Sequence, residues 1–131
     1  MLKKTIKYTD YNGNEREEDF YFNLTRAELI EMEASVNGGY TELIKQLINT
    51  TNTAEIAKVW KDVILNAYGV KSVDGKRFIK NQDVKDEFVQ SEAYSELYME
   101  LLSDPKKASA FIEAILPKEA HPDKPDLAVV Q

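Results

Sequence analysis

The sequence predicts an α+β, mainly α-helical fold, with an N-terminal β-hairpin packed on a bundle of about five helices. Three observations support this: alternating apolar positions around an Asn-Gly turn, apolar stripes at helical spacing, and a proline-bearing end without periodicity. We expect one folded domain over residues 1–116, divided into a hairpin (1–24) and a helical part (25–116). Residues 117–131 contain three prolines and are expected to form a mobile, flexible tail.

The hairpin is indicated by apolar residues at alternate positions on both sides of Asn12-Gly13. Leu2, Ile6 and Tyr8 precede this turn, and Phe20, Phe22 and Leu24 follow it. Asn-Gly is a strong hairpin signal because both residues accept positive φ angles. A two-stranded hairpin is marginally stable by itself, so its apolar face must pack on the helices.

Two helices are predicted next. The first begins at a capping box formed by Thr25 and Glu28, and stops at the Asn-Gly-Gly sequence of residues 37–39. The second is expected over residues 40–49, where Thr41 can serve as N-cap and apolar residues recur at helical spacing.

The third predicted helix, over residues 52–68, has the clearest apolar stripe and carries Trp60, so we expect it to be the central core helix. Asn52 can cap its start, and Gly69 is expected to end it as a C′ residue. Asp74-Gly75 then predicts a tight turn in a loop or small hairpin. The expected apolar anchors of this segment are Val70, Val73, Phe78 and Ile79.

The remaining helices follow this loop. Asn81 is predicted to cap "QDVKDEFVQ", which leads into "EAYSELYMELL" either through a break at Ser91 or as one continuous helix. The last helix is expected to open at Asp104-Pro105, since an N-cap followed by proline is a common helix start, and to bury Phe111.

The charge balance disfavours several classes of partner. Seventeen basic and 23 acidic residues give a net charge of −6, which repels nucleic acid and anionic lipid. A solvated loop explains the cluster of Lys71, Lys76, Arg77 and Lys80 better than a nucleic-acid site does. No apolar run is long enough for a signal peptide or a membrane span, so we expect a soluble intracellular protein.

No catalytic, cofactor or metal site is predicted. The chain has no cysteine, and its single histidine, His121, lies in the expected tail. Five residues separate Gly69 from Gly75 where a phosphate-binding loop needs four, and Arg77 stands where that loop needs Ser or Thr. The segment from Asp10 lacks the glycine and glutamate that a calcium loop places sixth and twelfth.

The tyrosine content suggests a protein interface. Seven Tyr and five Phe residues are more than a small core needs if several are exposed. Tyrosine favours interfaces because its ring is large and stiff and its tip is polar. Tyr21, Tyr94 and Tyr98 are therefore the candidate partner-binding residues, and the alternative is that such rings form the half-buried rim of the core.

Five phrases of the sequence carry a family resemblance: "TIKYTDYNG", "EDFYFNLTRAELIEME", "NGGYTELIKQLI", "YGVKSVDGKRFIK" and "SEAYSELYMELL". Together they resemble the tail assembly chaperones of long-tailed, siphovirus-type bacteriophages and prophages, over most of residues 1–116. The resemblance implies a protein of the host bacterial cytoplasm that binds the tape measure protein and keeps it soluble during tail tube assembly. It also implies absence from the mature virion.

The resemblance leaves several points open. The tail tube protein is a second candidate partner, self-association is compatible with the role, and many such genes also yield a longer, frameshifted product. No cofactor is required for binding of this kind. The first alternative is a structural tail or connector component of the virion, or another small phage interaction protein. The second is a small enzyme, against which the missing nucleophile, base and metal ligands argue.

Overall fold

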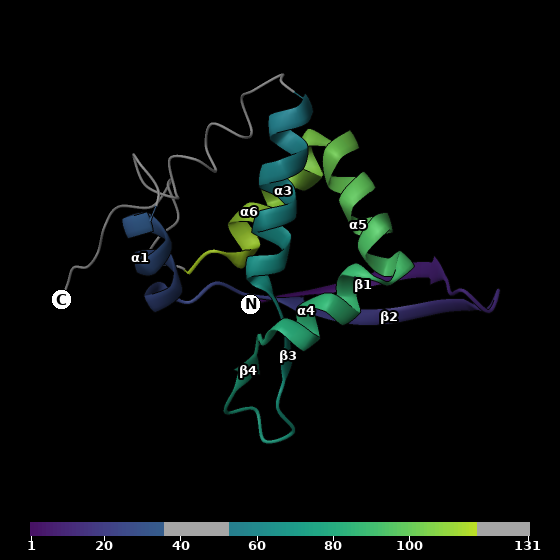
Figure 1. Cartoon of the computed structure of the whole chain (residues 1–131), viewed down its shortest axis with the longest axis horizontal. Coiled ribbons are helices and arrows are strands. Elements are labelled where there is room, and N and C mark those ends of the chain that lie inside the picture. The colour runs from purple at the N-terminus through teal and green to yellow at the C-terminus, as the bar shows by residue number, and fades with distance from the viewer. Residues whose placement is uncertain (36–52, 118–131) are drawn as a thin grey trace.

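The computed structural model describes residues 1–35 and 53–117 (Figure 1). Its elements are β1 (Leu2–Thr9), β2 (Glu15–Phe22), α1 (Arg26–Ser35), α3 (Thr53–Ala67), β3 (Tyr68–Lys71), β4 (Phe78–Ile79), α4 (Gln82–Val89), α5 (Glu92–Ser103) and α6 (Pro105–Ile115). The predicted α+β fold, with its N-terminal hairpin and mainly helical remainder, is confirmed. The helix predicted over residues 40–49 lies outside the described residues, as does the predicted tail from residue 118 onward.

The β1–β2 turn is held by the carboxylate of Asp10. Its Oδ1 accepts hydrogen bonds from the backbone N–H groups of Asn12 and Asn14, both at 2.9 Å. Gly13 has a φ of 86°, which glycine adopts without strain. The polar residues that resemble the start of a calcium loop therefore build a hairpin turn.

The sheet is larger than the sequence predicted. Its four antiparallel strands lie in the order β1-β2-β3-β4. Leu2 pairs with Phe22 in the hairpin, and Tyr21 pairs with Gly69 where β3 joins β2. The short hairpin predicted after the third helix thus extends the N-terminal hairpin into one sheet. This pairing joins segments far apart in sequence, and alternation within each strand cannot reveal it.

Three predictions for this segment were wrong. Gly69 does not cap α3: it lies in β3, and among the described glycines only Gly13 and Gly75 have positive φ. Its missing side chain serves packing instead, because a Cβ there would lie 2.7 Å from Cε2 of Phe78. Of the expected apolar anchors, Val73 is fully exposed at the tip of the loop and Val70 is 42% exposed.

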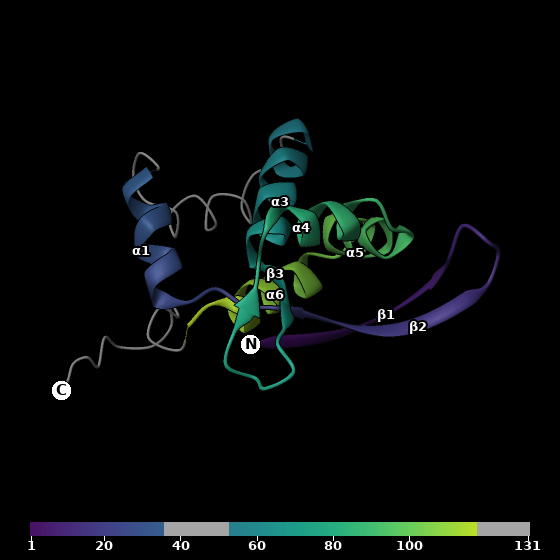
Figure 2. The ribbon, with the colours of Figure 1, turned by 60° about the horizontal axis from the view of Figure 1, so that its bottom comes forward.

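The core lies between the sheet and helices α3 to α6, which cover one side of the β1–β2 ribbon (Figure 2). Phe22 is fully buried at its centre, with ring centroids 5.6 Å from Tyr68, 5.9 Å from Phe88 and 5.3 Å from Phe111. Trp60 is 3% exposed and packs on Phe111, which confirms it as a core residue of α3.

The helix starts follow the predicted capping chemistry. Thr25 and Glu28 form the capping box: the Thr25 N–H donates to Glu28 Oε1 at 2.8 Å, and the Glu28 N–H to Thr25 Oγ1 at 3.1 Å. Asn81 Oδ1 accepts from Val84 N at 2.9 Å, and Asp104 caps α6 ahead of its proline. The helical conformation is interrupted at Ser91, which has an extended backbone, so α4 and α5 are separate helices.

Lys80 ties four segments together and is not part of a solvated basic loop. Its side chain is 13% exposed, and its Nζ donates to the backbone oxygens of Asn23 at 2.6 Å and Asn66 at 2.9 Å. The same Nζ contacts both carboxylate oxygens of Glu28, at 2.9 and 2.8 Å. The end of β4 is thereby fixed to α1, to the end of α3 and to the β2–α1 connection.

The ion pair also determines how Glu28 titrates. Burial alone would raise the pKa of this carboxyl, but hydrogen bonds from Lys80 and from Thr25, with the Lys80 charge, hold its pKa below the usual value. Because the folded pKa lies below the unfolded one, ionised Glu28 stabilises the fold above the unfolded pKa. That stabilisation is lost as the pH falls through the folded pKa.

We predict that Trp60→Ala lowers the free energy of unfolding by about 3–5 kcal/mol, because it removes a large buried ring and leaves a cavity. Urea denaturation followed by far-ultraviolet circular dichroism measures this, since the variant lacks the chain's single tryptophan. Lys61→Ala, at an exposed neighbouring position, is the control and should change little. An unchanged stability of Trp60→Ala would contradict the core assignment.

We predict that Glu28→Gln destabilises the fold at neutral pH by roughly 1–3 kcal/mol, because the buried ammonium of Lys80 loses its charged partner. The difference from the wild type should shrink as the pH falls below the ordinary glutamate pKa of 4.5. Unfolding curves at several pH values measure this, with exposed Glu31→Gln on the same helix as control. A pH-independent difference would show that the charge of Glu28 is not what matters.

Candidate partner-binding surface

The β1–β2 ribbon projects beyond the helices and exposes much of its surface (Figures 1 and 2). Side chains alternate between the faces of a strand, so one face meets the helices and the other points away. The outward face carries Lys3, Thr5, Lys7 and Thr9 of β1 and Glu15, Glu17, Asp19 and Tyr21 of β2. This face is therefore polar and charged, with one aromatic ring near its base.

Tyr21 is the aromatic residue of this outward face. It lies opposite Lys3 in the hairpin, its side chain is half-buried, and the Nζ of Lys71 stands 4.5 Å from its ring centroid. An ammonium over an aromatic face is attracted by the ring electrons. The contact orders the tyrosine ring while part of it stays accessible to solvent.

Tyr94 and Tyr98 lie one helical turn apart on α5, with ring centroids 5.5 Å apart. Tyr94 meets the ring of Phe88 edge-on at 5.7 Å. The hydroxyl of Tyr98 donates to the backbone oxygen of Ala57 at 2.7 Å and so joins α5 to α3. Both rings are half-buried and contribute to packing as well as to the surface.

The environment of Tyr94 changes its acidity. Burial, followed by the proximity of Tyr98 and Asp62, raises the pKa of Tyr94 to about 12. Its phenol therefore stays protonated in the folded chain at pH values where an unfolded tyrosine ionises. The protonated phenol of Tyr94 therefore favours the folded state below the pKa of an unfolded tyrosine. This stabilisation is lost as the pH rises toward the pKa of Tyr94 in the folded chain.

The three candidate tyrosines do not form one patch. Tyr21 points away from the helices, whereas Tyr94 and Tyr98 belong to a helix on the other side of the sheet. A partner that touched all three would have to wrap around the molecule. The structure therefore divides the candidate residues between a strand surface and a helix surface.

Sequence reasoning did not select the most exposed apolar groups. Tyr11 is 78% exposed at the tip of the β1–β2 turn, and Val73 is fully exposed at the tip of the β3–β4 loop. Ile30 on α1 is 69% exposed, and Met99 on α5 is 59% exposed. The exposure of Tyr11 could have been predicted from its position next to Asn12-Gly13, because a residue in a tight turn cannot pack under the strands that the turn connects.

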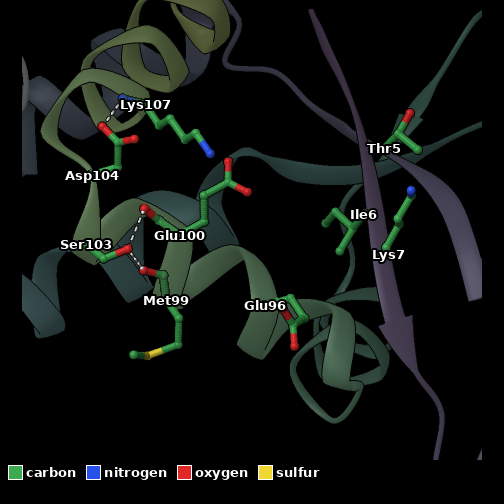
Figure 3. Close-up of a pocket in the computed structure, with 9 residues that line it drawn as sticks. All are labelled: Thr5, Ile6, Lys7, Glu96, Met99, Glu100, Ser103, Asp104 and Lys107. Carbon is green, nitrogen blue, oxygen red and sulfur yellow. Dashed lines mark hydrogen bonds between the residues drawn. The ribbon is translucent and has the colours of Figure 1, made fainter. Parts of the chain in front are cut away.

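A cleft of about 560 Å³ separates β1 from α5 and the start of α6 (Figure 3). It is lined by Thr5, Ile6, Lys7, Glu96, Met99, Glu100, Ser103, Asp104 and Lys107. Ile6 points from β1 toward α5, while Thr5 and Lys7 lie on the other side of the strand (Figure 3). An ion pair between Lys4 and Glu100 links strand and helix across this region.

A second cleft, of about 410 Å³, lies farther along the ribbon and shares Lys7 and Glu96 with the first. Here the hydroxyl of Tyr8 donates to Glu18, whose other oxygen lies 3.2 Å from Arg16 Nη1. That hydrogen bond is the main reason why the pKa of Tyr8 is raised. Polar contacts thus occupy the end of the ribbon that extends beyond the described helices.

The described residues lack a cluster of metal-binding side chains. Among residues 1–35 and 53–117, no group of three or more His, Asp or Glu side chains is arranged to hold a metal ion. The loop that fails the phosphate-binding pattern is held by its own hydrogen bonds. The Ser72 hydroxyl donates to Asp74 Oδ1 at 2.6 Å and accepts from the backbone N–H of Arg77 at 3.0 Å. None of the helices described is long and apolar enough to cross a membrane.

The fold and its surface define a small α+β domain whose exposed aromatic and apolar groups suit contact with other proteins. The model of the phage tail assembly chaperone family matches residues 1–124, so the chain belongs to that family. This confirms the resemblance seen in the sequence, and it implies partners among phage tail proteins. No match was found among curated proteins or among solved structures.

We predict that the free energy of unfolding of Tyr94→Phe falls less than that of the wild type between pH 10 and about pH 12. In the wild type, Tyr94 ionises in the unfolded chain over this range while it stays protonated in the folded chain, which favours unfolding. Unfolding free energies measured at several alkaline pH values test this. Tyr11→Phe removes a hydroxyl from an exposed ring and is the control. Parallel pH profiles of the wild type and Tyr94→Phe would contradict the assigned environment.

Proposed function

We propose that this chain binds the tape measure protein of its phage and keeps it soluble while tail tube subunits assemble around it. Membership of the tail assembly chaperone family, over residues 1–124, is the observation that carries the proposal. The chain acts by binding and not by catalysis. It works in the host bacterial cytoplasm and is absent from the mature virion, with the tail tube protein as a second partner.

The surface of the domain is compatible with this role. A long helical client exposes apolar side chains, which a chaperone must cover with apolar or aromatic surface of its own. Tyr21, Tyr94 and Tyr98 are the proposed contact residues, since aromatic anchors dominate the energetics of protein interfaces. The exposed ring of Tyr11 offers a further aromatic contact at the tip of the ribbon.

The charge of the chain fits a protein client better than a nucleic acid. A net charge of −6 gives no general attraction to phosphate, and it keeps a chaperone–client complex dispersed by mutual repulsion. Association through apolar and aromatic surface tolerates added salt, whereas association through phosphate contacts weakens steeply. Salt dependence therefore separates the two classes of partner.

A structural tail or connector component is the alternative function. Such a protein would be recovered with purified virions, whereas an assembly chaperone would be present in infected cells and missing from the particles. Quantitative mass spectrometry of purified particles distinguishes the two.

We predict that the tape measure protein, insoluble when expressed alone, becomes soluble and copurifies when expressed with this chain, and that the complex survives moderate salt. Tyr21→Ala and Tyr94→Ala should each weaken copurification, with Lys61→Ala as the exposed control and circular dichroism to confirm folding. A client that stays insoluble beside the wild type would refute the function. Retention by folded tyrosine variants would refute only the choice of surface.

A further inference from the structure

The outer edge of β1 has no strand beside it in the part of the chain that the structure describes. β1 is the first strand of the sheet and pairs only with β2 there. An unpaired edge presents a row of N–H and C=O groups that can bind another extended chain. Its neighbour in the sheet, β2, has β3 beside it at Tyr21 and Phe22.

The hydrogen-bonding pattern identifies the groups at that edge. The N–H of Asp10 donates to the C=O of Asn14, and bonded pairs alternate with unbonded ones along an antiparallel ladder. In the register of the hairpin, the even-numbered residues of β1 therefore bond to β2, while Thr5 and Lys7 turn their backbone groups outward. The bond from Asn23 N to Ala67 O fits the same alternation on β2.

The 560 Å³ cleft lies along this edge, with Thr5, Ile6 and Lys7 on one wall and α5 on the other (Figure 3). Its α5 wall includes exposed Glu96 and Met99. An incoming strand that paired with β1 would have one face toward this helix and its other face beside the outward side chains of β1.

The charges on the two faces specify the incoming strand. Lys3 and Lys7 are exposed on the outward face of β1; the Lys7 side chain is 80% accessible, although its Nζ lies 3.8 Å from Glu17 Oε2. Carboxylates on the outward face of an added strand would lie beside these ammonium groups, and opposite charges on neighbouring strands are stabilising. On the inner face, Glu96 favours a basic side chain, and Met99 offers contact to an apolar one.

One pairing of this edge with a second copy of the chain is unfavourable. Antiparallel pairing of two β1 strands centred on Thr5 would set Lys3 of one copy opposite Lys7 of the other. Like charges directly opposite each other destabilise a strand pair, so this register is disfavoured.

We propose that β1 receives an extended segment of the client protein, from outside its helices, as an added strand with carboxylates on its outward face and basic or apolar side chains toward α5. The inference rests on the proposed function for the identity of the client, and it names the site and the mode of recognition. Main-chain hydrogen bonds supply affinity in strand addition, and the alternating side chains supply specificity.

Thr5→Pro tests the added strand, because proline removes an N–H from the open edge while leaving the β1–β2 bonds in place. Copurification of the coexpressed tape measure protein should fall by about tenfold or more, as main-chain bonds carry much of the affinity. Thr5→Val controls for the lost hydroxyl bond to Asp19. Glu17→Pro, which removes an N–H from the opposite edge of the ribbon, should bind as the wild type does.

The outcomes separate the two proposals. Normal copurification by folded Thr5→Pro overturns the added strand and leaves the chaperone function intact. Failure of the wild type to bind the tape measure protein overturns both.

Amide hydrogen exchange provides a measurement that does not depend on a variant folding. The N–H groups of Thr5 and Lys7 should exchange rapidly in the free chain and gain protection in the complex, while those of Glu17 and Asp19 should not. Protection in the free chain overturns the proposal. It would mean that the chain's own residues cover the edge or, if protection depends on concentration, that a second copy does.

Discussion

The structure depends on how the backbone between β2 and α1 satisfies its hydrogen bonds where it crosses the core. Asn23 donates its N–H to Ala67 at 2.8 Å, and Leu24 donates to Ile115 at 2.9 Å. The oxygen of Asn23 accepts from the ammonium of Lys80. A buried peptide group without a partner is costly, so this crossing holds the ends of α3 and α6 and the end of β4 in fixed positions.

The same arrangement explains why the hairpin is buried at one end and open at the other. Phe20 and Phe22, near the crossing, pack against Phe88 and the rest of the core. Farther along the ribbon, the face toward the helices carries Glu18 and Arg16. Glu18 accepts hydrogen bonds from Tyr8 and Arg16, and Arg16 also donates to Asp10 at 2.6 Å. Charged groups of this kind give a helix no apolar surface to cover. The ribbon therefore extends past the helices, and clefts remain beside it.

The candidate surface was only partly predictable. Tyrosine content directed attention to Tyr21, Tyr94 and Tyr98, but composition gives no information on which face of the sheet a ring will occupy. The hydrogen bond from Tyr98 to Ala57 joins residues 41 positions apart, so the dual role of that ring in packing is invisible to a local pattern. The cleft beside β1 arises from the placement of α5, which no motif in either segment encodes.

The sequence by itself indicated the family, through phrases that resemble its members. It also determined the local features: the Asn12-Gly13 turn, the capping box of Thr25 and Glu28, and the core position of Trp60. These local features depend on neighbouring residues or on a periodic apolar pattern, and both can be identified in a short segment of sequence. Tertiary structure alone decided that β3 joins β2, that Gly69 makes room for Phe78, and that Lys80 is buried against Glu28. Each of these contacts joins segments that are far apart in sequence. Such contacts become favourable only when the whole core has formed, because burial and charge pairing depend on the assembled fold.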